Sequence, residues 1–286
     1  MRRSTLEELA RVAGVGLPAK LGFWPGMGLS AALAQFAVTL STLQTADAVQ
    51  RVADEMCRDA QAEGISTLEI RFAPQLHGGA SIEAIVDAAL AGVDGRAALI
   101  LCALYGESPD ICRALVEVAG TRPGVVGIDL AGGPATGHAF SLLDYQQPFR
   151  RAAELGLGRT VHAGEGRPPE EIRQAIVGLG AQRIGHGTTL LDDPEVVELV
   201  LERGVTIEAC PTSNVHTGVI EDVADHPIGR WLQRGVSVCI CTDNTLLSNV
   251  DLPGEYRRVQ ERAGVDREGL LACIAAGHAA AFTTQR

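Results

Sequence analysis

The sequence predicts an α/β fold of the (β/α)8 TIM-barrel type with the first strand missing. From Thr67 onward, short β-rich runs alternate with helical stretches and recur every roughly 20 to 35 residues, the repeat of βα units in a parallel sheet. Several runs, such as Ala97–Leu101 and Val236–Ile240, are apolar on both faces, which favours a sheet covered by helices. Glycines and polar residues gather directly after the runs. We therefore expect the chemistry at the carboxyl-terminal ends of the strands.

The segment before Thr67 is predicted to be helical. Ser4–Glu7 has the spacing of a capping box at a helix start, and Leu29–Leu43 is predicted as a second helix. Apolar residues then repeat at helical intervals from Ala48 until Gly64. This part of the chain shows no first strand, although eight strands close a barrel of this kind.

Seven strands are predicted in the remainder of the chain. They cover Leu68–Ala73, Ala97–Tyr105, Val125–Ala131, Thr160–Gly164, Arg183–Gly187, Val205–Cys210 and Val236–Thr242.

Composition limits the classes of function. With 286 residues, 46% apolar, we expect residues 1–286 to form one domain with a sizeable core. The formal net charge of −11 argues against a nucleic-acid partner, because such binding needs clustered cations. Neither a signal peptide nor a membrane span is evident, which predicts a cytoplasmic protein. The seven cysteines lie mostly in apolar segments and are interpreted as reduced core thiols.

Three motifs at strand ends carry candidate chemistry. In Val161–Gly166 (VHAGEG), small residues separate His162 from Glu165, so both side chains can point into one cavity. A strand-end histidine paired with an acid for structural reasons is the alternative.

The second motif is Arg183–Gly187 (RIGHG), in which glycines flank His186. Glycine weakens a strand, so its use here indicates that something approaches the imidazole closely. The alternative is a tight turn with a hydrogen-bonded histidine.

The third motif is Cys239–Asn244 (CICTDN), an apolar strand that ends in Asp243. A buried strand end is a costly place for a carboxylate unless a metal or another cation compensates it. The alternative role for Asp243 is the N-cap of a following helix. Together the motifs place four side chains at one barrel mouth, two as plausible zinc ligands, one as general acid or base and one as an orienting group.

These motifs, in this order, resemble the strand-end motifs of the adenosine deaminase family, the adenosine, adenine and AMP deaminase-type members of the amidohydrolase superfamily. The resemblance runs from Ser4 to Phe282. It also includes LAQF, EIRFAPQLH, GIDLAG and EACPTSN, at Leu33–Phe36, Glu69–His77, Gly127–Gly132 and Glu208–Asn214.

The resemblance implies a barrel of the metal-dependent hydrolase kind, with Zn²⁺ as cofactor and a purine nucleoside as small-molecule partner. It implies His162 and Asp243 as zinc ligands, with Asp243 also contacting the activated water. Glu165 would donate a proton to purine N1, His186 would hold the attacking hydroxide, and Gly132 would donate its N–H to purine N3. The implied reaction is hydrolytic deamination of adenosine or 2′-deoxyadenosine to the inosine-type product and ammonia.

The sequence departs from the family pattern in three places. The family's first strand carries two zinc-binding histidines as H-x-H, and nothing upstream of Ser4 supplies them. A late start of the chain explains this, and so does a natural shortened homologue that is inactive or binds its metal differently. Histidines that could replace the missing ligands are His77, His138 and His216.

The other two departures concern the substrate. Asn244 stands where the family usually has a second aspartate that donates to purine N7, and an amide can also donate there. Gly133 and Pro134 follow the GIDLAG motif where acidic residues are common. Two further readings therefore stay open, namely a deaminase of another amino-purine nucleoside and a catalytically silent homologue that binds nucleosides or a protein partner.

Overall fold

A computed structural model describes residues 1–135 and 137–282. Its centre is a sheet of seven parallel strands in the order β1-β2-β3-β4-β5-β6-β7. The strands are β1 (Glu69–Phe72), β2 (Ala98–Leu104), β3 (Val125–Ala131), β4 (Gly158–Ala163), β5 (Arg183–His186), β6 (Thr206–Ala209) and β7 (Ser237–Ile240). All seven predicted strands are confirmed, each within a few residues of its expected bounds. A strand order that follows the chain, with parallel pairing throughout, is the arrangement of a (β/α) barrel.

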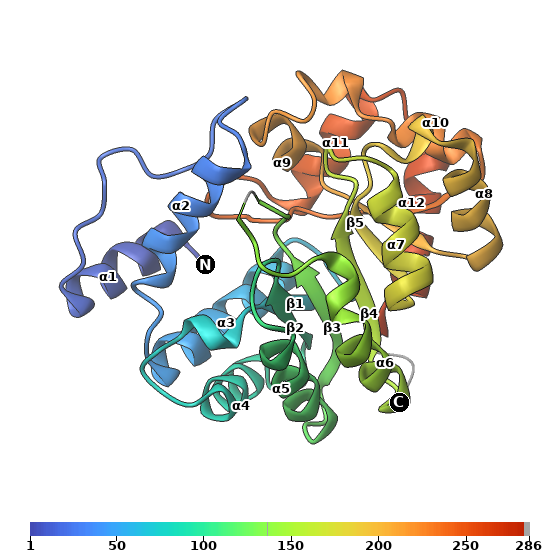
Figure 1. Ribbon diagram of the computed structural model, residues 1–286. Coiled ribbons are helices and arrows are strands. Elements are labelled where there is room, and N and C mark those ends of the chain that lie inside the picture. Colours follow the sequence, from blue (N-terminus) through green and yellow to red (C-terminus); the bar gives the residue numbers. More distant parts are fainter. Residues whose placement is uncertain (136, 283–286) are drawn as a thin grey trace.

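Helices lie around the outside of the curled sheet (Figure 1). They are α3 (Ala46–Ala62), α4 (Ile82–Val93), α5 (Pro109–Gly120), α6 (Gln146–Glu154), α7 (Glu170–Leu179), α8 (Pro194–Arg203), α9 (Pro211–His216), α10 (Ile228–Gln233), α11 (Leu252–Arg262) and α12 (Arg267–Ala280). Short 3₁₀ turns occupy Pro74–Leu76, Leu142–Tyr145, Leu190–Asp192 and Val223–Asp225. Among the described helices, none combines the length and the apolarity that crossing a membrane requires.

Helices α1 (Arg3–Ala13) and α2 (Leu29–Leu40) precede the sheet and lie to one side of it (Figure 1). The predicted capping box at the start of α1 is wrong. The helix begins at Arg3 and its N-cap, Arg2, makes no side-chain cap, while Arg3 pairs with Glu7 at 2.9 Å. Helix α2 ends three residues earlier than predicted.

The apolar core lies mainly between the sheet and its helices, and strands β2 and β3 are buried on both faces. A second, smaller cluster contains Ala98, Ile100, Val126 and Phe282. The Phe282 ring lies close under the strands, because a Cβ added at Gly158 would meet it at 2.1 Å. The cysteines are free thiols and five of the seven are buried, in agreement with the prediction.

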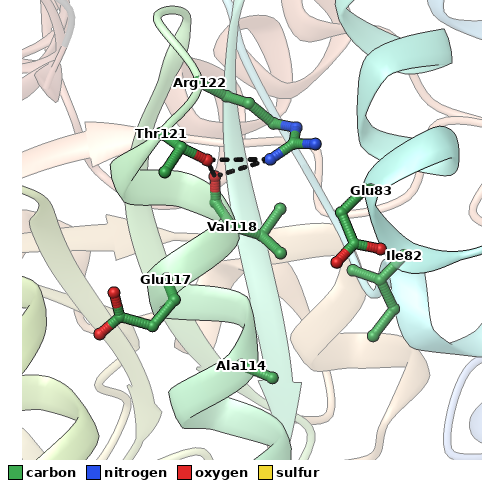
Figure 2. Close-up of a pocket in the computed structure, with 7 residues that line it drawn as sticks. All are labelled: Ile82, Glu83, Ala114, Glu117, Val118, Thr121 and Arg122. Atoms are coloured by element: carbon green, nitrogen blue, oxygen red, sulfur yellow. Dashed lines mark hydrogen bonds between the residues drawn. The ribbon is translucent and has the colours of Figure 1, made fainter.

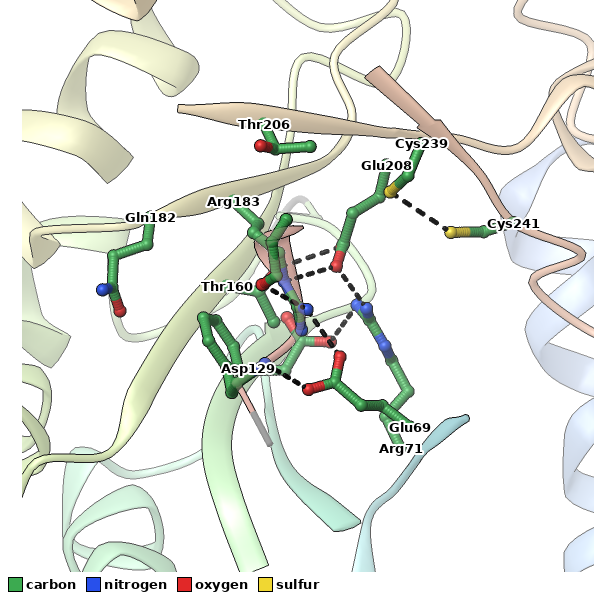
Figure 3. A network of polar contacts seen from close by, with 12 residues as sticks. Glu69, Arg71, Asp129, Thr160, Gln182, Arg183, Thr206, Glu208, Cys239 and Cys241 are labelled. Carbon is green, nitrogen blue, oxygen red and sulfur yellow. Dashed lines mark hydrogen bonds and ion pairs between the residues drawn. The ribbon is translucent and has the colours of Figure 1, made fainter. Parts of the chain in front are cut away.

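Charged side chains form a network between the strands (Figure 3). Glu208 on β6 accepts from Arg71 at 2.6 Å and forms an ion pair with Arg183, whose Nε lies 2.9 Å from the carboxylate. Arg183 also pairs with Glu69 at 2.5 Å, and its guanidinium lies 3.7 Å from the centroid of the Phe282 ring. Burial opposes the ionised form of Glu208, but the two arginines outweigh it and hold the pKa of that carboxyl well below its ordinary value.

Candidate active site

The structure places the three motifs at the carboxyl-terminal ends of the strands, as predicted. His162 lies on β4, and Glu165 lies two residues after the end of that strand. His186 is the last residue of β5, and Asp243 follows β7. The His162 and His186 rings lie 5.2 Å apart between centroids. A Cβ added at Gly185 would meet His162 Nδ1 at 3.3 Å, so the small residue beside His186 keeps the two imidazoles close.

One nitrogen of His162 is held by a buried carboxylate. Its Nδ1 lies 3.1 Å from Asp129 Oδ1, and Asp129 is fully buried on β3 and accepts from Arg71 at 3.1 Å. Burial opposes protonation of His162, but the Asp129 carboxylate outweighs it and raises the pKa of His162 above its ordinary value. This contact fixes the ring and leaves Nε2 available to a metal or a substrate.

Glu165 and His186 are linked through Asn214 of α9, and Thr217, just after α9, also holds Glu165. Thr217 donates its hydroxyl to Glu165 Oε1 at 3.1 Å, and Asn214 Nδ2 lies 3.5 Å from the same oxygen and 3.0 Å from His186 Nδ1. His186 Nδ1 is 3.7 Å from Glu165 Oε1. Both Glu165 and His186 are almost fully buried, so a carboxyl group and an imidazole face each other in a sheltered position.

Two of the predicted residues have left-handed backbone. His186 has φ 70° and Asp243 has φ 57°, a region in which side chains other than glycine are uncommon. Such conformations persist only where surrounding contacts impose them, and they concentrate at functional sites. The backbone therefore singles out the same two strand ends that the sequence does.

Asp243 is exposed, and its Oδ2 accepts from Ser213 Oγ at 2.6 Å. The carboxylate is near enough to His162 to favour the charged imidazole. The alternative role of Asp243 as a helix N-cap is wrong, because a turn follows it and helix α11 is capped by Asp251.

The two predicted substrate contacts lie on the loops after β3 and β7. Gly132 has φ 78°, and a Cβ there would meet nothing within 4 Å, so its backbone is accessible from one side. Asn244 uses its Oδ1 to accept from the Leu247 N–H at 2.6 Å, which leaves the Nδ2 group for another acceptor.

The sequence prediction gave no role to four polar side chains of the site, namely Asp129, Ser213, Asn214 and Thr217. Asp129 is the one charged residue in the apolar strand Val125–Ala131, and a buried carboxylate requires a partner. That signal could have identified it. Ser213, Asn214 and Thr217 act through contacts with Glu165, His186 and Asp243, residues distant in sequence, which no local pattern reveals.

The residues present supply only part of a zinc site. His162 and Asp243 are suitable ligand types, yet within residues 1–135 and 137–282 no three His, Cys, Asp or Glu side chains converge on a point that could hold a metal ion. A catalytic zinc site normally has three protein ligands. The described side chains therefore do not by themselves fit a catalytic zinc ion.

The three possible replacement histidines have other contacts. His77 Nδ1 pairs with the Leu43 carbonyl, and His138 Nδ1 accepts from the Ala135 N–H at 3.2 Å. His216 Nδ1 lies 3.3 Å from Ser248 Oγ. None of the three belongs to a metal-binding cluster among the described residues.

A cavity of about 490 Å³ lies on the outside of the barrel between α4 and α5 (Figure 2). Two of its polar residues contact each other, since Arg122 donates to Thr121 and to the Val118 carbonyl. It contains none of the strand-end groups, so we assign the chemistry to the barrel mouth instead.

The sequence model of the family "Adenosine deaminase" matches residues 1–286. The chain belongs to the adenosine deaminase family. An adenosine deaminase of Clostridium perfringens is 36% identical over 82% of this chain and 74% of its own length. The N6-mAMP deaminase of Arabidopsis shares the fold with a TM-score of 0.86 and 25% identity, covering 99% of this chain and 90% of that one.

A third comparison concerns metal. An amidohydrolase from Burkholderia ambifaria, solved with bound Zn, has a TM-score of 0.85 and 21% identity, covering 99% of this chain and 82% of its own. At that identity the likeness shows the fold alone. The family membership and these structures together confirm the predicted fold of a deaminase-type barrel.

Proposed function

We propose that the protein hydrolytically removes the 6-amino group of a purine nucleoside built on adenosine or 2′-deoxyadenosine, releasing ammonia. The observation that carries the proposal is the sheltered pair of Glu165 and His186 at the barrel mouth, which Asn214 bridges while Thr217 donates to Glu165. The relative named adenosine deaminase, at 36% identity, supports the reaction class. The similar N6-mAMP deaminase acts on a modified adenine nucleotide, which supports including adenosine derivatives among the candidate substrates.

The proposed roles follow from charge development during attack at purine C6. Attack places negative charge on the ring, and Glu165 in its protonated form removes that charge by donating to N1. His186 and Asp243 hold and orient the attacking water, with Ser213 fixing the carboxylate. Gly132 and Asn244 contact the purine at N3 and N7.

We propose Zn²⁺ as the cofactor, which would supply a hydroxide at neutral pH. His162 and Asp243 would be two of its ligands, with Asp129 orienting His162. The described side chains provide no third ligand, and the roles proposed for Glu165, His186 and Asp243 belong to side chains of this chain.

The test is loss of adenosine absorbance with the purified chain, with and without added Zn²⁺, together with elemental analysis for zinc. Glu165→Gln should lower turnover by roughly 10²- to 10⁴-fold, the usual worth of a general acid. Glu170→Gln, an exposed site on α7, is the matched control and should leave turnover unchanged. Equal turnover in the two variants would sink the role of Glu165.

One observation favours a second function. Since the described residues do not complete a metal site, a chain that binds purine nucleosides without converting them is the alternative. Binding of inosine without turnover of adenosine, in the presence of excess Zn²⁺, would establish that alternative.

A further inference from the structure

Arg167 lies in the loop between β4 and α7, two residues after Glu165. Its main chain is fixed because its carbonyl accepts from Thr189 Oγ1 at 2.6 Å. Its side chain is fixed because Nε donates to both carboxylate oxygens of Glu171, at 2.9 and 2.7 Å. The guanidinium is thus held in one position in the loop that follows Glu165.

The guanidinium occupies the space that a side chain at position 133 would need. A Cβ added at Gly133 would lie 2.6 Å from Arg167 Nη1 and 3.1 Å from Cζ, with Leu29 of α2 at 3.2 Å on another side. Gly133 directly follows Gly132, the proposed contact to purine N3. Arg167 can occupy this position because residue 133 is a glycine. The cation therefore fills the space that an acidic side chain at position 133 would need.

One end of the guanidinium is unsatisfied. Arg167 Nη2 is buried and has no hydrogen-bond partner among the described residues, although the side chain as a whole is 17% exposed. A buried donor without an acceptor is unusual in a folded protein and is costly. Arg183 also has unpaired donors, but its side chain is 5% exposed and lies between the strands, whereas Arg167 lies in a loop after β4 and is partly exposed. An oxyanion from outside the chain would satisfy Arg167, and it matches the planar fork of a guanidinium.

We propose that Arg167 determines substrate specificity by binding an oxyanion carried on the ribose side of the purine, such as a 5′-phosphate. The preferred substrate is then a phosphorylated amino-purine nucleoside rather than an uncharged one. This inference rests on the proposed function, since it places the purine at Gly132 and Glu165. Purine N3 and the ribose-bearing N9 are both bonded to C4 and lie on the same side of the purine, so a cation beside Gly133, the residue after Gly132, would lie on the sugar side of a purine bound in this way.

The test is calorimetric titration with inosine and with inosine 5′-monophosphate, neither of which the proposed reaction converts, so that binding is measured without turnover. In the unmodified protein the phosphate should tighten binding by roughly tenfold to a hundredfold, the worth of charge-assisted hydrogen bonds. Arg167→Gln should remove that ratio while leaving inosine affinity nearly unchanged, and Arg167→Lys should restore part of it.

Arg173→Gln is the matched control, because Arg173 lies on the nearby helix α7 and pairs with Glu170, Asp193 and Glu195. It should keep the full ratio, and the thermal midpoint of each variant checks folding. Equal affinity for the two ligands in the unmodified protein, or a ratio that survives Arg167→Gln, overturns the inference and leaves the deaminase proposal standing. Failure of both ligands to bind any variant overturns both.

Discussion

Two polar regions of the barrel differ in how their charges are paired and in their backbone geometry. In the charged network (Glu69, Arg71, Arg183 and Glu208), every charge faces an opposite charge and lies on a strand of ordinary geometry. At the mouth, His186 and Asp243 lie on left-handed backbone. Buried guanidinium donors without a hydrogen-bond partner among the described residues occur in both regions, at Arg167 Nη2 and at Arg183 Nε and Nη2. Asp129 connects the two, because it accepts from Arg71 and holds His162.

This difference distinguishes polar residues that stabilise the fold from polar residues that serve the proposed function. Breaking a buried ion pair is costly because it leaves the remaining charge uncompensated. Left-handed backbone in residues other than glycine also costs stability, and it concentrates at functional sites. Changes in the network should therefore reduce folding stability, whereas changes at the mouth should reduce function first.

The largest expected effect is in the network. Arg183→Met leaves Glu69 and Glu208 with less compensation and removes the stacking on Phe282, so it should cost about 3–5 kcal/mol of unfolding free energy. Arg173→Met, which breaks partly exposed pairs on α7, should cost no more than about 1 kcal/mol. Urea unfolding of both variants measures this, and similar losses would break the distinction between the two regions.

The network also shows what the sequence could not reveal. Apolar runs ending in glycine and polar residues were enough to predict all seven strands and the mouth, because those signals are local. The pairing of Arg71 with Glu208 joins residues 137 positions apart, and it depends on which side chains face the barrel interior. Likewise, the contact of Arg167 with Gly133 requires the register of two loops.

The motifs at the mouth were identified because polar residues and glycines interrupt apolar strands there. The expected burial of the Asp243 carboxylate is wrong, because Asp243 is exposed, and the structure shows left-handed backbone at this position instead. The start of α1 was wrongly predicted because capping-box spacing recurs inside helices, where Arg3 pairs with Glu7 instead of a cap forming. A short pattern fixes the type of an element better than its first residue.

A smaller effect concerns acid stability. Because the folded-state pKa of Glu208 lies well below its unfolded value of 4.5, its contribution is fully present above about pH 4.5 and is lost as the pH falls toward the folded pKa. Below the unfolded pKa the loss approaches about 1.4 kcal/mol for each pH unit. Glu208→Gln should flatten this part of the stability curve, measured by unfolding from pH 7 to pH 3. An unchanged slope would show that the arginines do not act on this carboxyl.

The smallest effect separates strain that serves function from strain that does not. Asp94 at the end of α4 and Asp243 at the mouth are both exposed aspartates with left-handed backbone, at φ 46° and φ 57°. Since glycine adopts this region without strain, each change to Gly should raise the unfolding free energy by up to about 1 kcal/mol. Only Asp243→Gly should abolish deamination, because only that carboxylate faces the proposed water. If Asp94→Gly lowered turnover as well, or if Asp243→Gly kept it, left-handed backbone would no longer distinguish the mouth from the rest of the fold.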